Sequence, residues 1–353
     1  MNRLFFFAAL LAITVFASLP SCKVQEPRRL VAFYNLENLF DTINTPAVRD
    51  REFTPESDKN WNTGRYEQKL RNMASVIVAM ADSQDLDAPA VVGLCEMENR
   101  DVLEDLVNSG ELKDFDYRIV HEDSPDRRGI DVALIYRPEY FQVSQYHSVP
   151  LKIYDDDGDR IYTRDQLVVS GELDGEAMHF IVNHWPSRYG GQERSAPFRD
   201  DAARLSRSIV DSLSRSNPDD AIILMGDLND DPDNESVRHH LRAGVKPQPP
   251  ESDSLFNATA PLFFEGEGTL CYRGVWNMFD QMIVTPNLLE EENGHYYLEK
   301  TGVFDPEFLR QQEGDYTGYP FRTYVGDWYH GGYSDHFPSY VILRKKKSGY
   351  FMR

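Results

Sequence analysis

The sequence has 353 residues, 41% of them hydrophobic and 12% aromatic, which is enough to bury a large core in one domain or two. Its 37 Lys and Arg residues against 58 Asp and Glu give a formal net charge of −21, which opposes undirected binding to polyanions such as nucleic acid or anionic lipid. A phosphate-bearing substrate must therefore meet a local basic patch or a bound cation, and the lack of repeats and of a Pro/Gly/Ser-rich linker favours one domain.

The N-terminus has the pattern of an export signal. Arg3 precedes an apolar stretch at residues 4–19, which is short for a transmembrane helix. The sequence Leu-Pro-Ser-Cys at 19–22 resembles a bacterial lipobox, in which Cys22 becomes the lipidated first residue, although proline is unusual there. A plain secretory signal with an incidental Cys22 is the alternative. We expect a protein of the bacterial cell envelope that is lipid-anchored, or else periplasmic or secreted.

Apolar runs that end in polar residues recur along the rest of the chain and predict buried strands. Residues 30–37 form the first strand and present Asn35 and Glu37 on one face of its tip. Residues 90–96 form the second and end on Glu96, for which an ordinary position beside a helix N-cap is the alternative.

Further elements are predicted without site residues. They are a polar loop over 41–64, amphipathic helices over 65–80, 101–107 and 200–214, a hairpin turn at 155–159 and an irregular stretch over 232–261. The Asp-rich hairpin turn lacks the twelfth-position Glu and the flanking helices of an EF-hand, so we favour a turn over a calcium loop.

Residues 127–136 predict another strand, with Asp131 near its start and Arg127 and Arg128 ahead of it. Either arginine could contact a phosphate or belong to a solvated turn. We include Asp131 among the candidate substrate-binding residues.

Residues 177–184 predict a strand that ends at His184 and is followed by a glycine-containing loop. Arg188, Arg194 and Arg199 follow within a few residues. We expect His184 and these arginines to meet a phosphate group, whereas a single histidine at a strand end is more often structural.

Residues 221–227 predict a fully buried strand that stops at Gly-Asp-Leu-Asn, so Asp227 and Asn229 leave the same face of the chain. A carboxylate can accept a proton from water while the amide donates to an oxyanion, which makes a catalytic pair; an Asx turn is the alternative. A strand over 279–285 carries Asp280 near its start.

The C-terminal part is rich in aromatic residues between 315 and 333. They precede Ser-Asp-His-Phe-Pro at 334–338, which contains Asp335 and His336 and leads into a closing strand over 339–343. Aromatic residues in a loop usually pack against the core, but beside a catalytic histidine they can stack on a base or a sugar.

These motifs, in this order, resemble the endonuclease/exonuclease/phosphatase superfamily, which includes pancreatic-type deoxyribonuclease, abasic-site endonucleases, bacterial sphingomyelinases and inositol-phosphate phosphatases. The resemblance covers residues 35–336, and residues 183–188, Asn-His-Trp-Pro-Ser-Arg, look most like secreted bacterial nucleases of the superfamily. It implies an α/β (α+β) fold, a DNase I-like four-layer sandwich of two packed mixed β-sheets flanked by helices, with the site at one rim where the strand ends meet.

The resemblance also implies a metal site. Glu96 matches the principal metal carboxylate of the superfamily, and Asn35 and Glu37 match oxygen donors close to it. Asp335 would add a direct or indirect contact to the metal. Oxygen ligands of this kind suit Mg²⁺ or Mn²⁺, which would neutralise phosphate charge and polarise the phosphorus.

Catalytic roles follow from the same resemblance. His336 matches the base that takes a proton from the attacking water, and Asp280 matches the partner that holds its tautomer. Asp227 would orient the water or accept its proton, and Asn229 would donate to a non-bridging oxygen. His184 matches the second histidine of the deoxyribonuclease and sphingomyelinase branches.

We therefore expect a Mg²⁺- or Mn²⁺-dependent hydrolase of phosphate esters, first of all a phosphodiesterase or nuclease, over residues 30–345. A lipoprotein signal peptide (1–21) and a tether (22–29) would precede it, and a basic tail (346–353) would follow. Nucleic acid, short or single-stranded, is the leading substrate, and we infer no protein partner. Phosphomonoesterase, sphingomyelinase-like and inositol-phosphatase activities are alternatives, as is a surface lipoprotein that binds a ligand without turnover.

Overall fold

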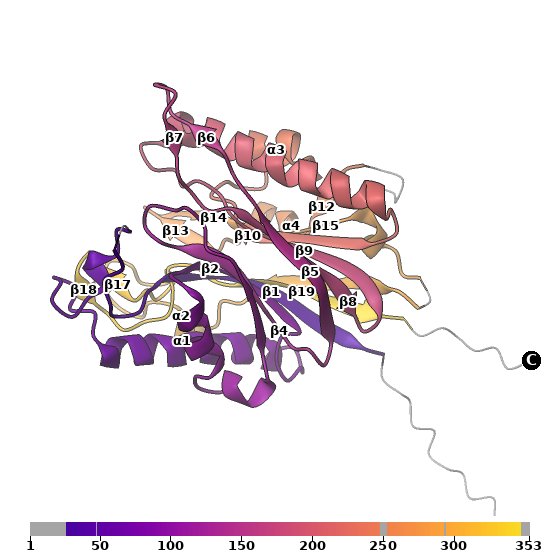
Figure 1. The fold of residues 1–353 in the computed structure, drawn as a ribbon. Helices are drawn as coiled ribbons and strands as arrows, with labels where there is room; N and C mark the ends of the chain where they lie inside the picture. The colour runs from indigo at the N-terminus through magenta and orange to yellow at the C-terminus, as the bar shows by residue number, and fades with distance from the viewer. Residues whose placement is uncertain (1–25, 47, 248–252, 293, 347–353) are drawn as a thin grey trace, which may run out of the picture.

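A computed structural model describes residues 26–46, 48–247, 253–292 and 294–346 (Figure 1). The expected signal peptide, the first four residues of the expected tether and all but the first residue of the expected basic tail lie outside the described residues. Within those described ranges, no helix is both long enough and apolar enough to span a membrane.

Two large mixed sheets form the centre of the molecule. The first has six strands in the order β16-β19-β1-β2-β4-β3. These strands are β1 (Arg28–Leu39), β2 (Val91–Met97), β3 (Arg118–His121), β4 (Asp131–Tyr136), β16 (Tyr296–Val303) and β19 (Ser339–Lys345). β1 and β2 are parallel, whereas β19 is antiparallel to β1 and β4 is antiparallel to β2.

The second sheet has seven strands in the order β11-β12-β15-β10-β9-β8-β5. These are β5 (Phe141–Val149), β8 (Gln166–Leu173), β9 (Glu176–His184), β10 (Ala221–Asp227), β11 (Ala243–Gly244), β12 (Leu255–Asn257) and β15 (Asp280–Val284). β9 and β10 are parallel and β15 is antiparallel to β10.

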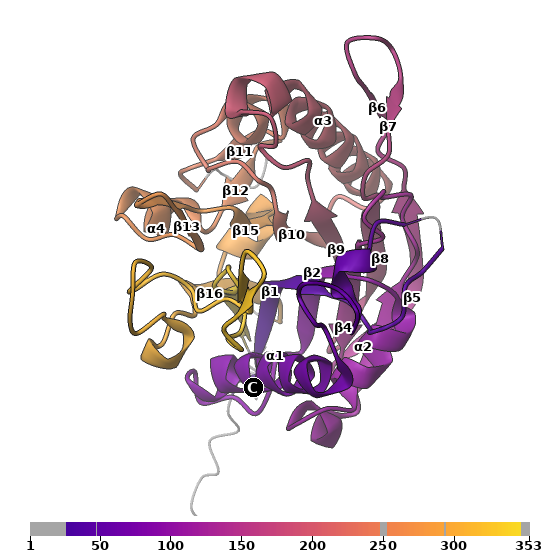
Figure 2. The ribbon, with the colours of Figure 1, turned by 90° about the vertical axis from the view of Figure 1, so that its left-hand side faces the viewer.

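Three two-stranded ribbons lie in the connections. They are β6 (Ile153–Tyr154) with β7 (Arg160–Ile161), β13 (Leu270–Tyr272) with β14 (Val275–Asn277), and β17 (Tyr324–Val325) with β18 (Trp328–Tyr329). The first ribbon confirms the predicted hairpin turn at residues 155–159, which projects from the body of the molecule in Figures 1 and 2.

The two-residue alternation of β1 explains how the layers form. Val31 and Phe33 point into the space between the sheets, where they share one apolar cluster with Phe180 of β9 and Met225 of β10. Tyr34 points the other way and belongs to the cluster outside the first sheet. Because successive side chains of a strand leave opposite faces, an apolar β1 can bury both faces at once.

Helices cover the outer face of each sheet (Figure 1). α1 (Thr63–Asp82) and α2 (Arg100–Val107) cover the first sheet, and Ile77 of α1 belongs to the same cluster as Tyr34. α3 (Gln192–Ser216) covers the second sheet, where its Val210 joins Leu224 of β10. Helix, sheet, sheet and helix thus make four layers, which confirms the expected fold class.

Short helical segments occupy the remaining connections. They are α4 (Ala260–Phe264), a π-helical turn (Ser236–His240) and four 3-10 turns (Arg51–Phe53, Leu112–Phe115, Pro286–Leu289 and Glu307–Leu309). The described residues between 232 and 261, which are 232–247 and 253–261, contain only short elements, in agreement with the irregular stretch predicted there.

Strands that carry predicted site residues meet at one rim, which faces the viewer in Figure 2. β1, β2, β9 and β10 end at this rim, while the antiparallel strands β15 and β19 begin there. Asp227, the last residue of β10, lies opposite His184 on one neighbouring strand and opposite Asp280 on the other. The pairing of these three strands therefore places three predicted site residues in one row.

Candidate active site

His336 lies at this rim, where its imidazole contacts the Asp280 carboxylate. It precedes β19, and its backbone N–H donates to the Ser334 hydroxyl, which in turn donates to the Asn35 carbonyl. Its Nδ1 atom lies 2.6 Å from Asp280 Oδ2, and both side chains are buried. This contact fixes the ring so that Nε2, the other nitrogen, faces the rest of the site.

Two further carboxylates lie near the free nitrogen of His336. Its Nε2 atom is 3.9 Å from Asp227 Oδ2 and 3.9 Å from Asp335 Oδ1, distances too long for direct hydrogen bonds. Burial by itself lowers the pKa of His336, but Asp280, Asp227 and Asp335 outweigh it and hold that pKa well above its usual value. His336 is therefore a strongly basic imidazole with an open nitrogen.

Asp227 connects the two sheets at the rim. Asn35, at the tip of β1, donates from Nδ2 to Asp227 Oδ2 at 3.0 Å, and the backbone N–H of Asn229 donates to Oδ1 at 2.9 Å. Burial is the main cause that raises the pKa of Asp227, and the neighbouring Asp280 and Glu96 raise it further, although His336 opposes them. The Asn229 amide donates to the Trp185 carbonyl at 3.0 Å, which leaves its second N–H for a ligand.

Glu96 lies at the same rim, beside His184. Its Oε2 accepts the backbone N–H of Asn38 at 3.0 Å, and its Oε1 lies 3.8 Å from both His184 Nε2 and Arg128 Nη1. His184 Nε2 also lies 3.6 Å from Asp227 Oδ2. Burial, followed by Arg164, Arg128 and His336, holds the pKa of His184 well below its usual value, so this imidazole is neutral.

Several residues at the rim have a left-handed backbone that a non-glycine residue seldom adopts. The φ angles are 50° at Glu37, 56° at Asn38, 61° at Glu96 and 50° at Asn229. Such strain costs about 1–3 kcal/mol per residue and persists where the surrounding structure enforces it, which is common at functional sites. Four such residues at the ends of β1, β2 and β10 mark this rim independently of side-chain chemistry.

Glu37 is held by protein groups. Its Oε2 accepts the Thr323 N–H at 2.7 Å and lies 3.6 Å from Lys69 Nζ, while its Oε1 lies 3.4 Å from Arg322 Nε. Arg322 also forms an ion pair with Asp335. Burial and then Asp335 raise the pKa of Glu37, whereas His336 and Arg322 overcome burial and lower the pKa of Asp335.

Sequence reasoning missed Lys69 and Arg322. Lys69 is 2% exposed, donates to Thr323 Oγ1 at 2.6 Å and binds the Tyr333 carbonyl, so it ties α1 to the loop before His336. The sequence contained one indication of a buried Lys69. It lies three residues after Tyr66 and four before Met73, and this spacing places it on the inner, apolar face of the predicted helix. Arg322 carried no such signal within its aromatic segment.

The arginines expected to bind phosphate are placed differently. Arg188 donates to the Asn229 carbonyl at 2.8 Å and lies 3.3 and 3.1 Å from Asp230 and Asp231, contacts that support the loop after β10. Arg199 is fully buried and paired with Asp230 at 2.8 Å. Arg194 is exposed in the first turn of α3, and its substrate role stays a prediction. The arginines that reach the rim are Arg128 and Arg322.

Asp131 lies at the same edge but in a separate cluster. Its Oδ2 contacts His121 Nε2 at 2.9 Å and its Oδ1 accepts the Ser124 N–H. Among the described residues, His121, Asp123 and Asp131 are the group whose metal-ligand atoms all lie within 4.8 Å of one another. The predicted metal ligands do not converge as closely.

The chemistry of the predicted ligands nevertheless fits a hard divalent cation. Carboxylate oxygens of Glu96, Asp227 and Asp335 lie within 4 Å of the His184 or His336 ring, and Asp280 Oδ1 is a buried oxygen without a hydrogen-bond partner. Such an excess of carboxylate over cationic groups in a buried space is relieved by a bound cation, and oxygen donors suit Mg²⁺ and Mn²⁺.

The sequence matches one known protein family. A family model described as "Endonuclease/Exonuclease/phosphatase family" matches residues 30–345. No curated protein matches the chain in sequence.

Solved structures resemble most of the chain. An endonuclease/exonuclease/phosphatase family protein from Bacteroides thetaiotaomicron has a TM-score of 0.54 at 18% identity, over 91% of this chain and 96% of that one. A mannosyl-6-phosphatase from the same organism has a TM-score of 0.51 at 18% identity, over 89% and 99%. D. rerio TDP2 complexed with a single-strand DNA product has a TM-score of 0.53 at 13% identity, over 90% and 98%. At these identities the likeness shows the fold.

Proposed function

This chain belongs to the endonuclease/exonuclease/phosphatase family, and we propose that it hydrolyses phosphate esters, phosphodiesters first of all, with the help of a divalent metal ion. The observation that supports this most is the His336–Asp280 contact of 2.6 Å with Asp227 on the far side of the imidazole. A binding protein has no need for a histidine oriented in this way.

The proposed chemistry begins with a water molecule between His336 Nε2 and Asp227 Oδ2. In the neutral form of the imidazole, Nδ1–H donates to Asp280 and Nε2 carries the lone pair that accepts the proton of the water. A divalent cation held by the neighbouring carboxylates would lower the pKa of His336 and favour this neutral form. Asp227, held by Asn35 and by the Asn229 backbone, orients the water for in-line attack on phosphorus. Asn229 and the neutral His184 would donate hydrogen bonds to phosphate oxygens.

Glu96, Asn35 and Asp335 would hold the metal ion. When bound, Mg²⁺ or Mn²⁺ would neutralise phosphate charge and polarise the ester. Glu37 acts less directly, because Lys69, Arg322 and Thr323 already surround its carboxylate. We therefore assign Glu37 to positioning the tip of β1 and the loop that carries Arg322.

The space around the site supports a phosphate with two substituents. Cavities of about 270 and 320 Å³ lie on either side of the Arg322–Asp335 ion pair, and both are lined by these two residues. A monoester would need only one of them. Arg128 and Arg322 can neutralise the phosphate between them, which replaces the role first expected of Arg188 and Arg199.

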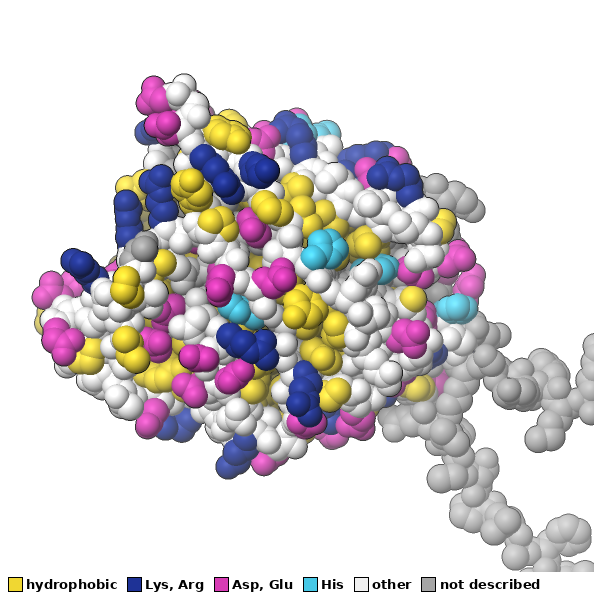
Figure 3. Space-filling view, in the orientation of Figure 1, with side chains coloured by type: hydrophobic (Ala, Val, Ile, Leu, Met, Phe, Trp, Pro, Cys, Tyr) yellow, Lys and Arg dark blue, Asp and Glu magenta, His cyan; other side chains and the backbone are white. Residues whose placement is uncertain are grey.

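Nucleic acid is a candidate substrate on this basis, and the D. rerio structure with a single-strand DNA product is a precedent within the same fold. On the face beside the rim that Figure 3 shows, basic side chains are interspersed with acidic ones. Together with the net charge of −21, this distribution favours a short or small substrate over a long duplex.

Metal dependence can be tested directly. EDTA should reduce hydrolysis of bis-p-nitrophenyl phosphate to background and added Mg²⁺ or Mn²⁺ should restore it. Glu96→Gln should raise the Mg²⁺ concentration for half-maximal rate by about tenfold or more, because a carboxylate ligand is lost.

Glu98→Gln is the matched control for this test. Glu98 is also largely buried, but its carboxylate accepts from the Asp41 N–H and the Thr45 hydroxyl, each at 2.9 Å. It should leave the Mg²⁺ requirement unchanged. Full activity of the wild-type protein in EDTA would rule out the metal-dependent mechanism.

We also propose that the mature chain is anchored to the bacterial envelope through a lipid on Cys22, a residue outside the described part of the chain. Cys22→Ala should move the protein from the membrane fraction to the soluble fraction of cells, because a lipidated N-terminus anchors firmly. If the wild-type protein and Cys22→Ala distribute equally between the membrane and soluble fractions, a plain secretory signal is favoured instead.

A further inference from the structure

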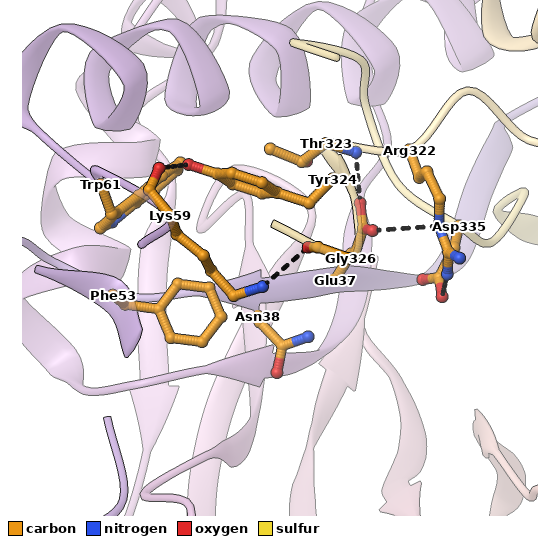
Figure 4. A pocket seen from close by; sticks show the side chains of 10 residues that line it. All are labelled: Glu37, Asn38, Phe53, Lys59, Trp61, Arg322, Thr323, Tyr324, Gly326 and Asp335. Carbon is orange, nitrogen blue, oxygen red and sulfur yellow. Dashed lines mark hydrogen bonds and ion pairs between the residues drawn. The ribbon is translucent and has the colours of Figure 1, made fainter. Parts of the chain in front are cut away.

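The smaller of the two cavities opens directly beside the catalytic rim (Figure 4). Its wall includes Glu37 and Asp335, which also border the site. Asp335 Oδ1 lies 3.9 Å from His336 Nε2. A group bound in the cavity and a phosphate held at His336 would therefore be separated only by the Asp335 side chain.

The wall of this cavity is polar and balanced in charge. Two carboxylates, Glu37 and Asp335, are matched by two cations, Lys59 and Arg322. Asn38, labelled in Figure 4, contributes a side-chain carboxamide, which offers both a donor and an acceptor. Such a wall favours a neutral group that can both donate and accept hydrogen bonds over a second phosphate or an amine.

The aromatic residues of the wall do not offer a stacking surface. Phe53 and Tyr324 are each only 8% exposed. Lys59 Nζ already lies 5.8 Å from the Phe53 ring centroid and 5.0 Å from that of Tyr324. A flat base lacks an open ring face here, and a quaternary ammonium group would meet a resident positive charge.

The cavity is also small. Its volume of about 270 Å³ falls just below the range of about 300–1,000 Å³ typical of sites for drug-sized ligands. It therefore suits a single ring-sized unit. The larger cavity differs in character, because its wall includes Tyr272 and Tyr316, which are 62% and 48% exposed.

We propose that the cavity lined by Asn38, Lys59 and Arg322 binds a hydroxyl-rich group of the substrate, a sugar or another polyol joined to the scissile phosphate. This inference rests on the proposed phosphoesterase function. Adjacent hydroxyls would donate to and accept from the Asn38 carboxamide. They would also accept from the Lys59 ammonium, which the Gly326 carbonyl holds at the cavity wall at 3.0 Å.

Two symmetrical diesters test the proposal. Because both substituents of each phosphate are identical, the result does not depend on which of them is the leaving group. They are bis(glucos-6-yl) phosphate, followed by ³¹P NMR, and bis-p-nitrophenyl phosphate, followed by absorbance. Lys59→Gln and Asn38→Gly should each lower kcat/KM for the sugar diester by about tenfold more than for the aryl diester. Glycine is chosen at Asn38 because it tolerates the φ angle of 56° there.

Lys113→Gln, in the exposed turn at Leu112–Phe115, is the control for loss of a lysine and should leave both rates unchanged. Thermal unfolding checks that each variant is folded. If Asn38→Gly does not fold, the comparison of the two diesters rests on Lys59→Gln alone. Equal losses with both diesters would overturn the sugar subsite while the phosphoesterase function stands. Failure of the wild-type protein to cleave either diester, with each metal, would instead overturn the proposed function.

Discussion

Replacing His336 by alanine should lower kcat/KM for bis-p-nitrophenyl phosphate by about 10²- to 10⁴-fold, the usual contribution of a positioned general base. The reason is geometric, because Nε2 is the only ring nitrogen left to accept a proton once Nδ1 contacts Asp280 at 2.6 Å. Asp280→Asn should cause a comparable loss. The amide of asparagine would donate to Nδ1 and so place the imidazole proton on Nε2, the wrong tautomer for a base.

His179→Ala is the matched control. His179 also has an acidic partner, Asp220 at 3.1 Å, and a hydroxyl partner, Ser170 at 2.7 Å, but it lies near the beginning of β9, away from the rim. Its replacement should leave kcat/KM unchanged. If His336→Ala and His179→Ala retain equal activity, His336 is not the base and the proposed mechanism is wrong.

The strands that carry the site were predictable because they are central. β1, β2 and β10 are continuous apolar runs, since both of their faces are covered, and each run stops at a polar residue. β3, β5, β8 and β16 were not predicted. β5 lies at a sheet edge and is largely exposed after Phe141, so its sequence has no apolar run.

One helix boundary was wrong for a local reason. α3 begins at Gln192 instead of residue 200, because Gly190 and Gly191 indicated a loop. Ser195 closes the first turn by donating to the Gly191 carbonyl at 2.8 Å, and the buried Arg199 packs under it. The two glycines thus precede the helix, with Gly191 at its N-cap, and only Pro197 lies inside it.

Site residues at strand tips could be predicted, but their supporting cations could not. Strand order brings Asp227, His184 and Asp280 together through register alone. Arg322 and Lys69, by contrast, reach Glu37 from segments far away in sequence. Sequence spacing carries no information on such contacts. For the same reason, Arg188 and Arg199 were predicted to bind phosphate, although they pair with acidic residues of the loop after β10.

The buried contact between Lys69 and Glu37 leads to the largest expected change in stability. Lys69→Met should lower the free energy of unfolding by about 3–5 kcal/mol, because it removes one of the two cations that face the Glu37 carboxylate, the one that is itself fully buried. Chemical denaturation in metal-free buffer measures the change. Lys113→Met, at an exposed position, should alter the unfolding free energy little and controls for the loss of charge.

The pH dependence and a double variant separate the ion pair from loss of packing. Burial already raises the pKa of Glu37 in the folded state, and loss of Lys69 raises it further. A carboxyl group whose pKa is raised by folding loses stability as pH rises, so the destabilisation by Lys69→Met should be small near pH 5 and largest above pH 7. Adding Glu37→Gln should remove this pH dependence and recover part of the lost stability. A destabilisation that is the same at all pH values and persists in the double variant would instead assign the role of Lys69 to its contacts with Thr323 and Tyr333.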